Sequence, residues 1–152
     1  MVQQTRSDCY DKAAELLARR PHFRQELAAK LLSRSFSLEE VDLTLDRLAE
    51  QSLLDDHQNA LDLASGRFQR KGFGPRRVRA ELERRGVSSD IATLVLETVF
   101  PDRESEVVSA RKAMLKWRLS VEEDRHKVAR QLERKGYSKS VILQLLDEIR
   151  TT

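Results

Sequence analysis

The sequence predicts an all-α protein in which three tandem three-helix repeats, each similar to a helix-turn-helix, stack into an elongated, curved rod. The main observation is internal repetition. The segment 78–88, VRAELERRGVS, recurs at 128–138 as VARQLERKGYS, and a weaker copy, LAAKLLSRSFS, lies at 27–37. Repetition of a segment at a regular spacing along the chain is typical of stacked supersecondary units that bury their apolar faces against one another. Composition agrees, because 5 glycines, 3 prolines and 5% aromatic residues leave few of the turns that a β-sandwich needs.

Residues 9–54 form the first predicted repeat, and residues 1–8 before it are expected to fray. Apolar residues at helical spacing predict one helix that ends before Pro21 and a second helix after it. Ser37 and Glu40 then form a capping box, in which a hydroxyl and a carboxylate satisfy free backbone N–H groups at a helix start. The third helix follows this box.

Residues 55–100 form the second predicted repeat. Asp55 is a candidate N-cap of its first helix, which the glycines and proline of 71–75 (KGFGP) bring to an end. That proline suits the first position of the next helix, where its missing N–H costs nothing. Gly86 is expected to end this second helix in the left-handed conformation, and Ser88 to cap the third.

Residues 101–152 form the third predicted repeat. Ser120 and Glu123 make a second candidate capping box, after the first helix of this repeat. Gly136 is expected to end the next helix, and Ser138 to cap the last one. The three repeats together predict nine helices and no strands.

Composition also limits where and how the protein can act. No apolar stretch reaches the length of about 18 residues that a membrane span needs, and the N-terminus lacks the apolar core of a signal peptide. Cys9 is the only cysteine, so neither a disulfide framework nor a cysteine zinc site is expected. We therefore expect a monomer in the reducing cytoplasm, with no membrane partner.

Charge is strongly segregated along the chain, although the net charge is only +3. The segment 38–56 is acidic, whereas the segment 66–86 is basic. Segregation of this kind is typical of a protein whose partner is itself charged or patterned. The candidate residues for binding a partner or DNA are the basic ones of the second segment: Arg67, Arg70, Lys71, Arg76, Arg77, Arg79, Arg84 and Arg85.

Two interpretations of this basic segment are open. In the first, the charges only solvate a helix and pair at i, i+4 spacing, as Arg77 with Glu81 would. In the second, they bind a phosphate or an acidic protein surface, since guanidinium groups match both. The second is favoured, because two glutamates cannot neutralise eight basic residues locally. A helical wheel places Arg76, Arg77 and Arg84 on the solvated side of the predicted helix.

No catalytic residue, metal ligand or cofactor site is expected. The sequence Asp55-Asp56-His57 contains candidate metal ligands, but carboxylates in a first helical turn are explained by the helix dipole. A second histidine or cysteine cluster is missing, and so are a phosphate-cradling glycine loop and a nucleophile elbow. The sequence therefore does not predict an enzyme.

The middle repeat resembles a known family. SLLDD at 52–56, then a helix, then RKGFGPRRVRAEL at 70–82 and Gly86, resemble the signature of RecX, the bacterial regulator of the RecA recombinase. There are three departures: Asn59 replaces an aromatic residue, one extra residue precedes the proline, and Ser35 replaces a glycine. The signature positions are Leu54, Asp55, Asp56, Gly72, Gly74, Pro75, Leu82 and Gly86.

The resemblance implies a specific function. RecX proteins are three tandem three-helix repeats that bind the RecA–DNA filament along its groove and modulate it, mainly by inhibition. They affect filament growth, ATPase activity and strand exchange in DNA recombination and repair. The RecA filament is then the expected partner, and weak binding to single- or double-stranded DNA can accompany it. The alternative is a helical DNA-binding module that acts through phosphate contacts, and the sequence leaves open whether the basic face meets RecA or DNA.

Overall fold

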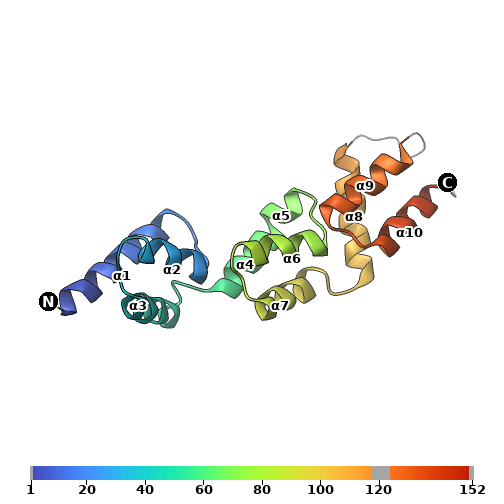
Figure 1. Cartoon of the computed structure of the whole chain (residues 1–152). Coiled ribbons are helices and arrows are strands. Elements are labelled where there is room, and N and C mark those ends of the chain that lie inside the picture. The colour runs from blue at the N-terminus through green and yellow to red at the C-terminus, as the bar shows by residue number, and fades with distance from the viewer. Residues whose placement is uncertain (1, 118–123, 151–152) are drawn as a thin grey trace.

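The computed structural model describes residues 2–117 and 124–150, and all regular structure in these ranges is helical. Figure 1 shows the helices along an elongated body with the two termini at opposite ends. The prediction of an all-α, elongated fold is therefore confirmed. None of the described helices is long and apolar enough to cross a membrane. The helices are α1 (Val2–Arg19), α2 (Arg24–Leu32), α3 (Leu38–Glu50), α4 (Asp56–Ser65), α5 (Arg67–Arg70), α6 (Pro75–Arg84), α7 (Ser89–Val99), α8 (Arg103–Trp117), α9 (Arg125–Lys135) and α10 (Lys139–Arg150).

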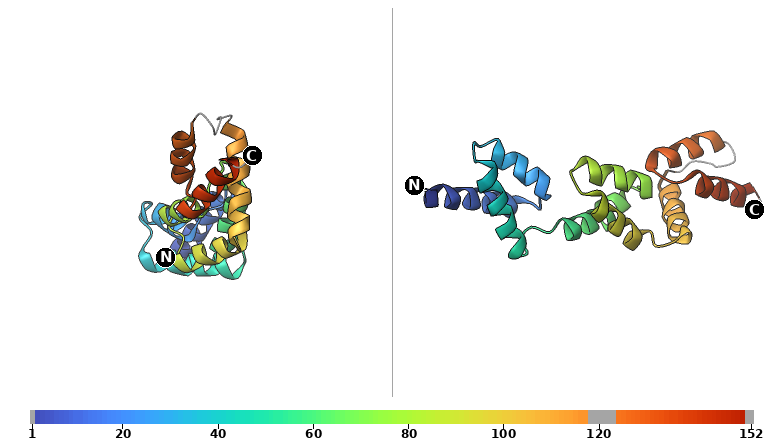
Figure 2. Two further views of the ribbon diagram at one scale, coloured as in Figure 1. Left: turned by 90° about the vertical axis from the view of Figure 1, so that its right-hand side faces the viewer. Right: turned by 60° about the horizontal axis from the view of Figure 1, so that its bottom comes forward.

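The helices follow one another in successive groups along this body (Figure 2). Three hydrophobic cores lie within these groups. Helices α1–α3 enclose the first core, α4–α7 the second and α8–α10 the third. The repeated leucines Leu31, Leu82 and Leu132 lie in the three cores, and each is 0% exposed. The internal repetition of the sequence thus corresponds to repeated burial of the same position.

Helix starts follow the local signals of the sequence. Ser37 Oγ accepts a hydrogen bond from the Glu40 N–H at 3.1 Å, and the Glu40 carboxylate accepts from the Ser37 N–H at 2.9 Å. The first predicted capping box is therefore confirmed. Asp55 caps α4 at 3.1 Å and Ser88 caps α7 at 3.2 Å. The other predicted capping box, at 120–123, lies outside the described residues.

The second helix of each unit is followed by a residue in the left-handed conformation. Gly86 has φ 90° and Gly136 has φ 97°, as the sequence predicts for a glycine after a helix. Ser35, at the equivalent position of the first unit, has φ 69° although it carries a Cβ. Ser35 therefore adopts a positive φ like the two glycines, although its Cβ makes this backbone conformation less favourable.

The first helix of the second unit is broken, whereas the sequence predicts a single helix. α4 ends at Ser65, Gly66 has φ −105° and ψ −93°, and α5 is a single turn. A Cβ on Gly66 would lie 2.8 Å from the carbonyl oxygen of Asp62, so the break needs a glycine. The break raises the number of described helices above the predicted nine.

The N-terminal helix extends further than the sequence predicts. α1 begins at Val2, so it includes residues that were expected to fray. Cys9 is fully buried in the first core, and burial raises the pKa of its thiol. Cys9 is therefore a packed core residue.

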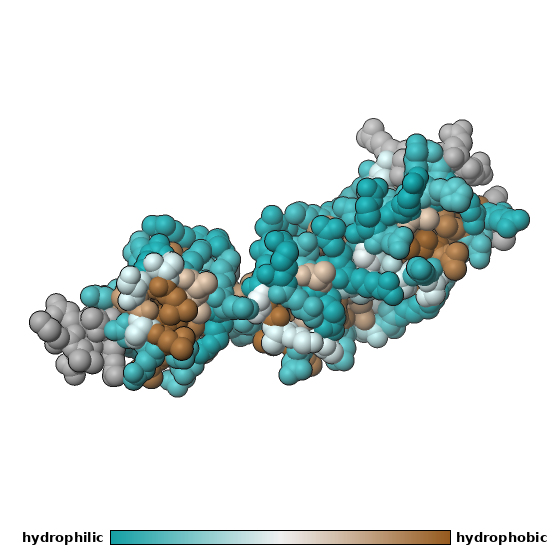
Figure 3. All heavy atoms as spheres, in the orientation of Figure 1, coloured by the Kyte–Doolittle hydropathy of each residue, from teal (hydrophilic) through white to brown (hydrophobic). Residues whose placement is uncertain are grey.

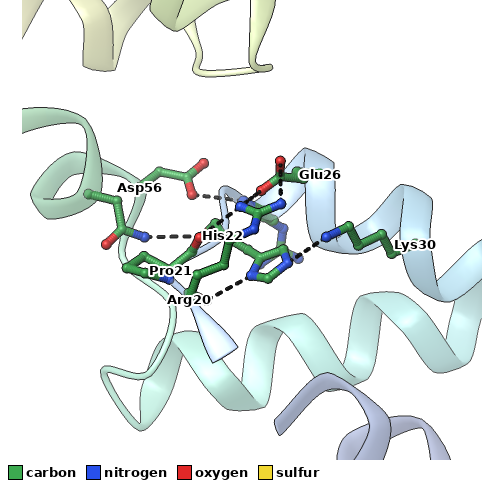
Figure 4. A network of polar contacts seen from close by, with 8 residues as sticks. Arg20, Pro21, His22, Glu26, Lys30 and Asp56 are labelled. Atoms are coloured by element: carbon green, nitrogen blue, oxygen red, sulfur yellow. Dashed lines mark hydrogen bonds and ion pairs between the residues drawn. The ribbon is translucent and has the colours of Figure 1, made fainter. Parts of the chain in front are cut away.

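The first and second units join through the turn before α2. Phe23 packs into the second core, where it is 7% exposed. The side-chain amide of Asn59 donates to the His22 carbonyl at 3.1 Å, and the Arg24 N–H donates to Asp56 Oδ1 at 2.8 Å (Figure 4). Asn59 thus supplies a hydrogen bond between units.

The second and third units join through the turn before α6. The Gly74 N–H donates to the Lys135 carbonyl at 2.7 Å. The Tyr137 hydroxyl donates to the Gly72 carbonyl at 2.9 Å, and burial raises the pKa of Tyr137 to about 12. This hydroxyl therefore remains a hydrogen-bond donor at every physiological pH, and the junction is closely packed.

Candidate partner-binding surface

Three of the eight basic candidate residues form ion pairs on α6. Arg77 and Arg84 share the Glu81 carboxylate at 3.2 and 2.7 Å, and Arg79 pairs with Glu83 at 3.2 Å. Hydrogen bonds from Arg84 and Arg77 lower the pKa of Glu81, so this carboxylate is ionised at neutral pH. Pairing within the helix, one of the two interpretations above, therefore accounts for part of the cluster.

Two of these arginines also connect α6 to its surroundings. Arg79 donates to Thr93 Oγ1 on α7 at 2.8 Å. Arg77 donates to the Arg134 carbonyl in the third unit at 3.2 Å, and its guanidinium lies 4.7 Å from the centre of the Phe73 ring. The helical wheel places Arg77 in solvent, but its side chain is only 41% exposed and bridges two units.

The positive charges of the remaining basic candidates have fewer carboxylate partners. Arg67, Arg70 and Arg76 are exposed, and none of them pairs with a carboxylate of the described residues. Arg85 is half-buried, its guanidinium lies 5.8 Å from the Phe68 ring centre, and its Nε has no hydrogen-bond partner. These side chains keep the surface positive around α5 and α6.

Three cations surround the ring of Phe73 and form what we call the Phe73 cluster: Lys71, Arg77 and Lys135. Their charged groups lie 5.8, 4.7 and 5.3 Å from the ring centre, within range of cation–π attraction. Lys135 also donates to the Lys71 carbonyl at 3.0 Å. Burial lowers the pKa of Lys135, and the charges of Arg77 and Lys71 lower it further.

Sequence reasoning missed Lys135, which lies 64 residues from Lys71. The repeat alignment of 78–88 with 128–138 places Lys135 over Arg85, a residue already in the candidate set. That alignment was the one signal that pointed to it. The contact itself depends on how the turn before α6 packs on the end of α9.

Two open hollows on the second and third units are lined in part by basic residues. One of about 440 Å³ lies between α5 and α8, and one of about 630 Å³ lies along α9. Among the described residues that line them, Glu133 is the single carboxylate. Figure 3 shows hydrophilic residues covering α5, α6 and α9. The basic residues of the hollows are Arg70, Lys112 and Lys116 in the first and Lys127, Arg130 and Arg134 in the second.

Known proteins share this architecture and sequence. Residues 9–48 match the model of the first three-helix domain of RecX, and residues 55–96 match the model of its second three-helix domain. The regulatory protein RecX of Pseudomonas fluorescens is 35% identical over 135 residues, which cover 88% of this chain and 86% of that protein. The chain belongs to the RecX family.

Other RecX proteins give the same result. The regulatory protein RecX of Chlorobium phaeobacteroides is 32% identical over 143 residues, which cover 92% of each chain. The RecX crystal structure from Lactobacillus salivarius superposes with a TM-score of 0.82 over 99% of both chains, at 21% sequence identity. At 21% identity, this superposition shows similarity of fold alone. RecX is a family of regulatory proteins, not of enzymes.

Several of the residues predicted as a RecX signature are core or helix-capping residues. Leu54 and Leu82 are 5% and 0% exposed in the first and second cores. Pro75 occupies the start of α6, where its fixed φ suits a helix. Asp55 and Gly86 provide the cap of α4 and the left-handed end after α6. These five positions serve folding, and none of them lines either of the two hollows.

Other signature residues hold neighbouring units together. A Cβ on Gly74 would lie 2.7 Å from the Tyr137 ring, and one on Gly72 would lie 3.0 Å from the Ala113 Cβ. Asp56 accepts from a backbone N–H of α2, and burial raises the pKa of its carboxyl. The positions predicted as a RecX signature therefore lie in cores, caps and junctions between units, and Gly72 also lines the hollow between α5 and α8.

The chemistry available on this RecX surface is anion binding. Guanidinium and ammonium groups outnumber carboxylates around α5, α6 and α9, and charge-assisted hydrogen bonds to phosphate or carboxylate are strong. In the part of the chain that the structure describes, no group of three or more histidine, cysteine, aspartate or glutamate residues could hold a metal ion. Asp55 and Asp56 are both engaged with backbone N–H groups.

Proposed function

We propose that this RecX protein binds the RecA–DNA filament along its groove and modulates it, mainly by inhibition of filament growth, ATPase activity and strand exchange in DNA recombination and repair. Membership of the RecX family carries the proposal, since relatives matched over most of their length are named as regulatory proteins. An elongated helical body with a basic surface that ion pairs compensate only in part supports it.

The linear arrangement of units suits a partner with repeated subunits. Residues 9–54, 55–100 and 101–152 are the proposed units of a monomer that contacts several successive RecA subunits. Each contact can be weak, because linking them raises the effective concentration of the next one. The protein is proposed to act where RecA filaments form, in the cytoplasm.

Charge would set the direction of binding. Acidic residues are concentrated on α3 of the first unit, and basic residues on α5 and α6 of the second. Complementary patches on successive subunits would favour one orientation of the body in the groove. Arg67, Arg70 and Arg76 are the proposed contact residues on the basic side, since they are exposed and unpaired within the described residues.

The test is the single-stranded-DNA-dependent ATPase of the cognate RecA, with this protein titrated below one molecule per RecA at two salt concentrations and with DNA in excess. The proposal predicts loss of activity at these low ratios, since one bound molecule affects several subunits. Inhibition that disappears on adding DNA would instead indicate competition for DNA.

A second candidate function is a DNA-binding module that acts through phosphate contacts, and the Phe73 cluster favours it as an accompanying activity.

Substituting Arg67, Arg70 and Arg76 jointly with Glu tests the contact residues proposed for the filament. It separates surface charge from folding, because Arg77 and its junction stay intact. The proposal predicts that this variant inhibits the ATPase less than the parent protein. Unchanged inhibition would contradict the role assigned to these arginines.

A further inference from the structure

In the second and third units, the turn that follows the second helix is covered by a helix of the preceding unit. The turn at Gly136 packs on the start of α6, where the Gly74 N–H donates to the Lys135 carbonyl at 2.7 Å. The turn at Gly86 packs on the start of α2, since a Cβ on Gly86 would lie 2.8 Å from the Gln25 Cβ. The same turn thus serves twice as a docking surface for a helix.

The equivalent turn of the first unit is open. The alignment of 27–37 with 78–88 and 128–138 places Ser35 over the two glycines of the other turns. Residues 33–35, 37 and 38 are exposed, and Phe36 packs inward against the first core. Among the described residues, no helix covers this turn as α2 and α6 cover the other two.

Two exposed leucines flank the open turn. Leu32 is 41% exposed and Leu38 is 65% exposed. The other two units have exposed polar residues at both aligned positions, so the fold of a unit does not require leucine there. The residues aligned with the leucines are Glu83 and Glu133 for the first and Ser89 and Lys139 for the second.

The leucines run against what a terminal unit needs for solubility. The outer face of an end unit in a stacked array is normally polar, because no neighbour covers it. Here the outer unit is more apolar than the inner ones at the two aligned positions, and Figure 3 shows hydrophobic residues at the surface of this unit. An apolar surface in such a place is typical of a site for another molecule.

Ser35 indicates which molecule can bind. A Cβ on Gly136 would collide with the backbone of α6 and would lie 2.5 Å from the Arg77 Cβ. Ser35 carries such a Cβ, so a second copy of this chain cannot dock here as the units dock on one another. Arg34 is the single charged residue in the segment 32–38, so the surface matches an apolar partner rather than a charged one.

We propose that the segment 32–38 of the first unit is a docking site for an apolar helix of a partner protein, with Leu32 and Leu38 as its anchors. A helix is the occupant because helices cover both equivalent turns, and an amphipathic helix commonly binds through a few spaced apolar side chains. The inference rests on the proposed function, in which the partner is the RecA subunit beside the first unit. It adds an apolar contact at one end of the body to the charged contacts of α3, α5 and α6.

The experiment measures binding of the intact chain to RecA filaments assembled on immobilised single-stranded DNA, by surface plasmon resonance at two salt concentrations. The test variant combines Leu32→Gln with Leu38→Ser, which changes no charge at two exposed positions that are polar in the other units. We expect binding about tenfold weaker, because two anchors lose their apolar contact. The factor should be the same at both salt concentrations, since salt screens charges and not apolar contacts.

The matched control combines Leu94→Gln with Leu143→Ser. These leucines are 52% and 60% exposed on α7 and α10, so the control makes the same chemical changes outside the first unit. Binding of the control should stay within about twofold of the parent protein, a difference smaller than one good contact contributes. Circular dichroism and thermal melting establish that both double variants are folded.

Three results would overturn the site: equal losses in the test variant and its control, a loss that vanishes at high salt, or self-association of the parent protein that the test variant abolishes. The last would make a second copy the occupant, and sedimentation velocity at high protein concentration measures it. Parent-like binding by the test variant, with RecA inhibition intact, removes this site alone. A parent protein that does not bind the filament would remove the proposed function and this inference together.

Discussion

Gly136 is the position at which one added methyl group should most disturb the packing of the third unit on the second. Its φ of 97° costs a residue with a Cβ roughly 1–2 kcal/mol. The new Cβ would also collide with the backbone nitrogen of Arg77 and would lie 2.5 Å from the Arg77 Cβ. These atoms cannot move without shifting α6, and overpacking of this kind costs roughly another 1–3 kcal/mol.

The matched substitution is Gly72→Ala in the same junction. Gly72 has φ 75°, but its Cβ would meet only the Ala113 Cβ, at 3.0 Å. We therefore expect Gly72→Ala to lower the free energy of unfolding by roughly 1–2 kcal/mol and Gly136→Ala to lower it by roughly 2–5 kcal/mol. Gly136→Asn should not recover the difference, because asparagine tolerates the left-handed conformation but still has a Cβ.

Urea denaturation followed by two probes measures these effects. Far-ultraviolet circular dichroism reports the whole chain, and fluorescence of Trp117, the one tryptophan, reports the third core against which it packs. The Trp117 transition should move to lower urea in Gly136→Ala more than in Gly72→Ala. Equal losses of stability, within about 0.5 kcal/mol, would refute the argument that the collision with Arg77 matters.

Three further outcomes follow from the structure. Ser35→Gly should raise the free energy of unfolding by about 1 kcal/mol, because it relieves a φ of 69° at an exposed residue, and unchanged urea stability would contradict this. Burial lowers the pKa of His22 below its usual value of 6.5, because the buried ring favours the neutral form. The free energy of unfolding should therefore be highest above pH 6.5 and should fall as the pH drops from 6.5 toward the lower folded-state pKa. A His22→Gln variant should lose that part of the pH dependence, and a variant whose urea stability retains it would exclude His22 as the source. Cys9, at 0% exposure, should react with a thiol reagent in native protein only as fast as the first unit opens, so rapid labelling without denaturant would show that this core is open.

Local signals in the sequence predicted much of the fold. Ser37, Asp55 and Ser88 cap helices as expected, since capping depends on neighbours three residues away. Gly86 and Gly136 end helices as expected, because a left-handed residue needs no tertiary information. The break at Gly66 was missed, since an isolated glycine is tolerated in many helices and only the packed unit shows why this one interrupts.

The candidate site was predicted less completely, because it depends on contacts between units. The basic segment gave Lys71 and Arg77, but Lys135 joins them only through the packing of two turns that are far apart in the sequence. A helical wheel treats α6 as if one face were solvent, so it could not show that Arg77 reaches the third unit. Cys9 likewise required α1 and α3 to be packed before its burial could be known.

The central claim is that this protein acts on the RecA–DNA filament, and growth of that filament on single DNA molecules tests it most directly. RecA would be allowed to extend from a preformed filament end, with this protein present at well below one molecule per RecA subunit and with free DNA in excess. The account predicts that extension slows and that further DNA does not restore it. Extension at the normal rate, or full recovery on adding DNA, would contradict the account.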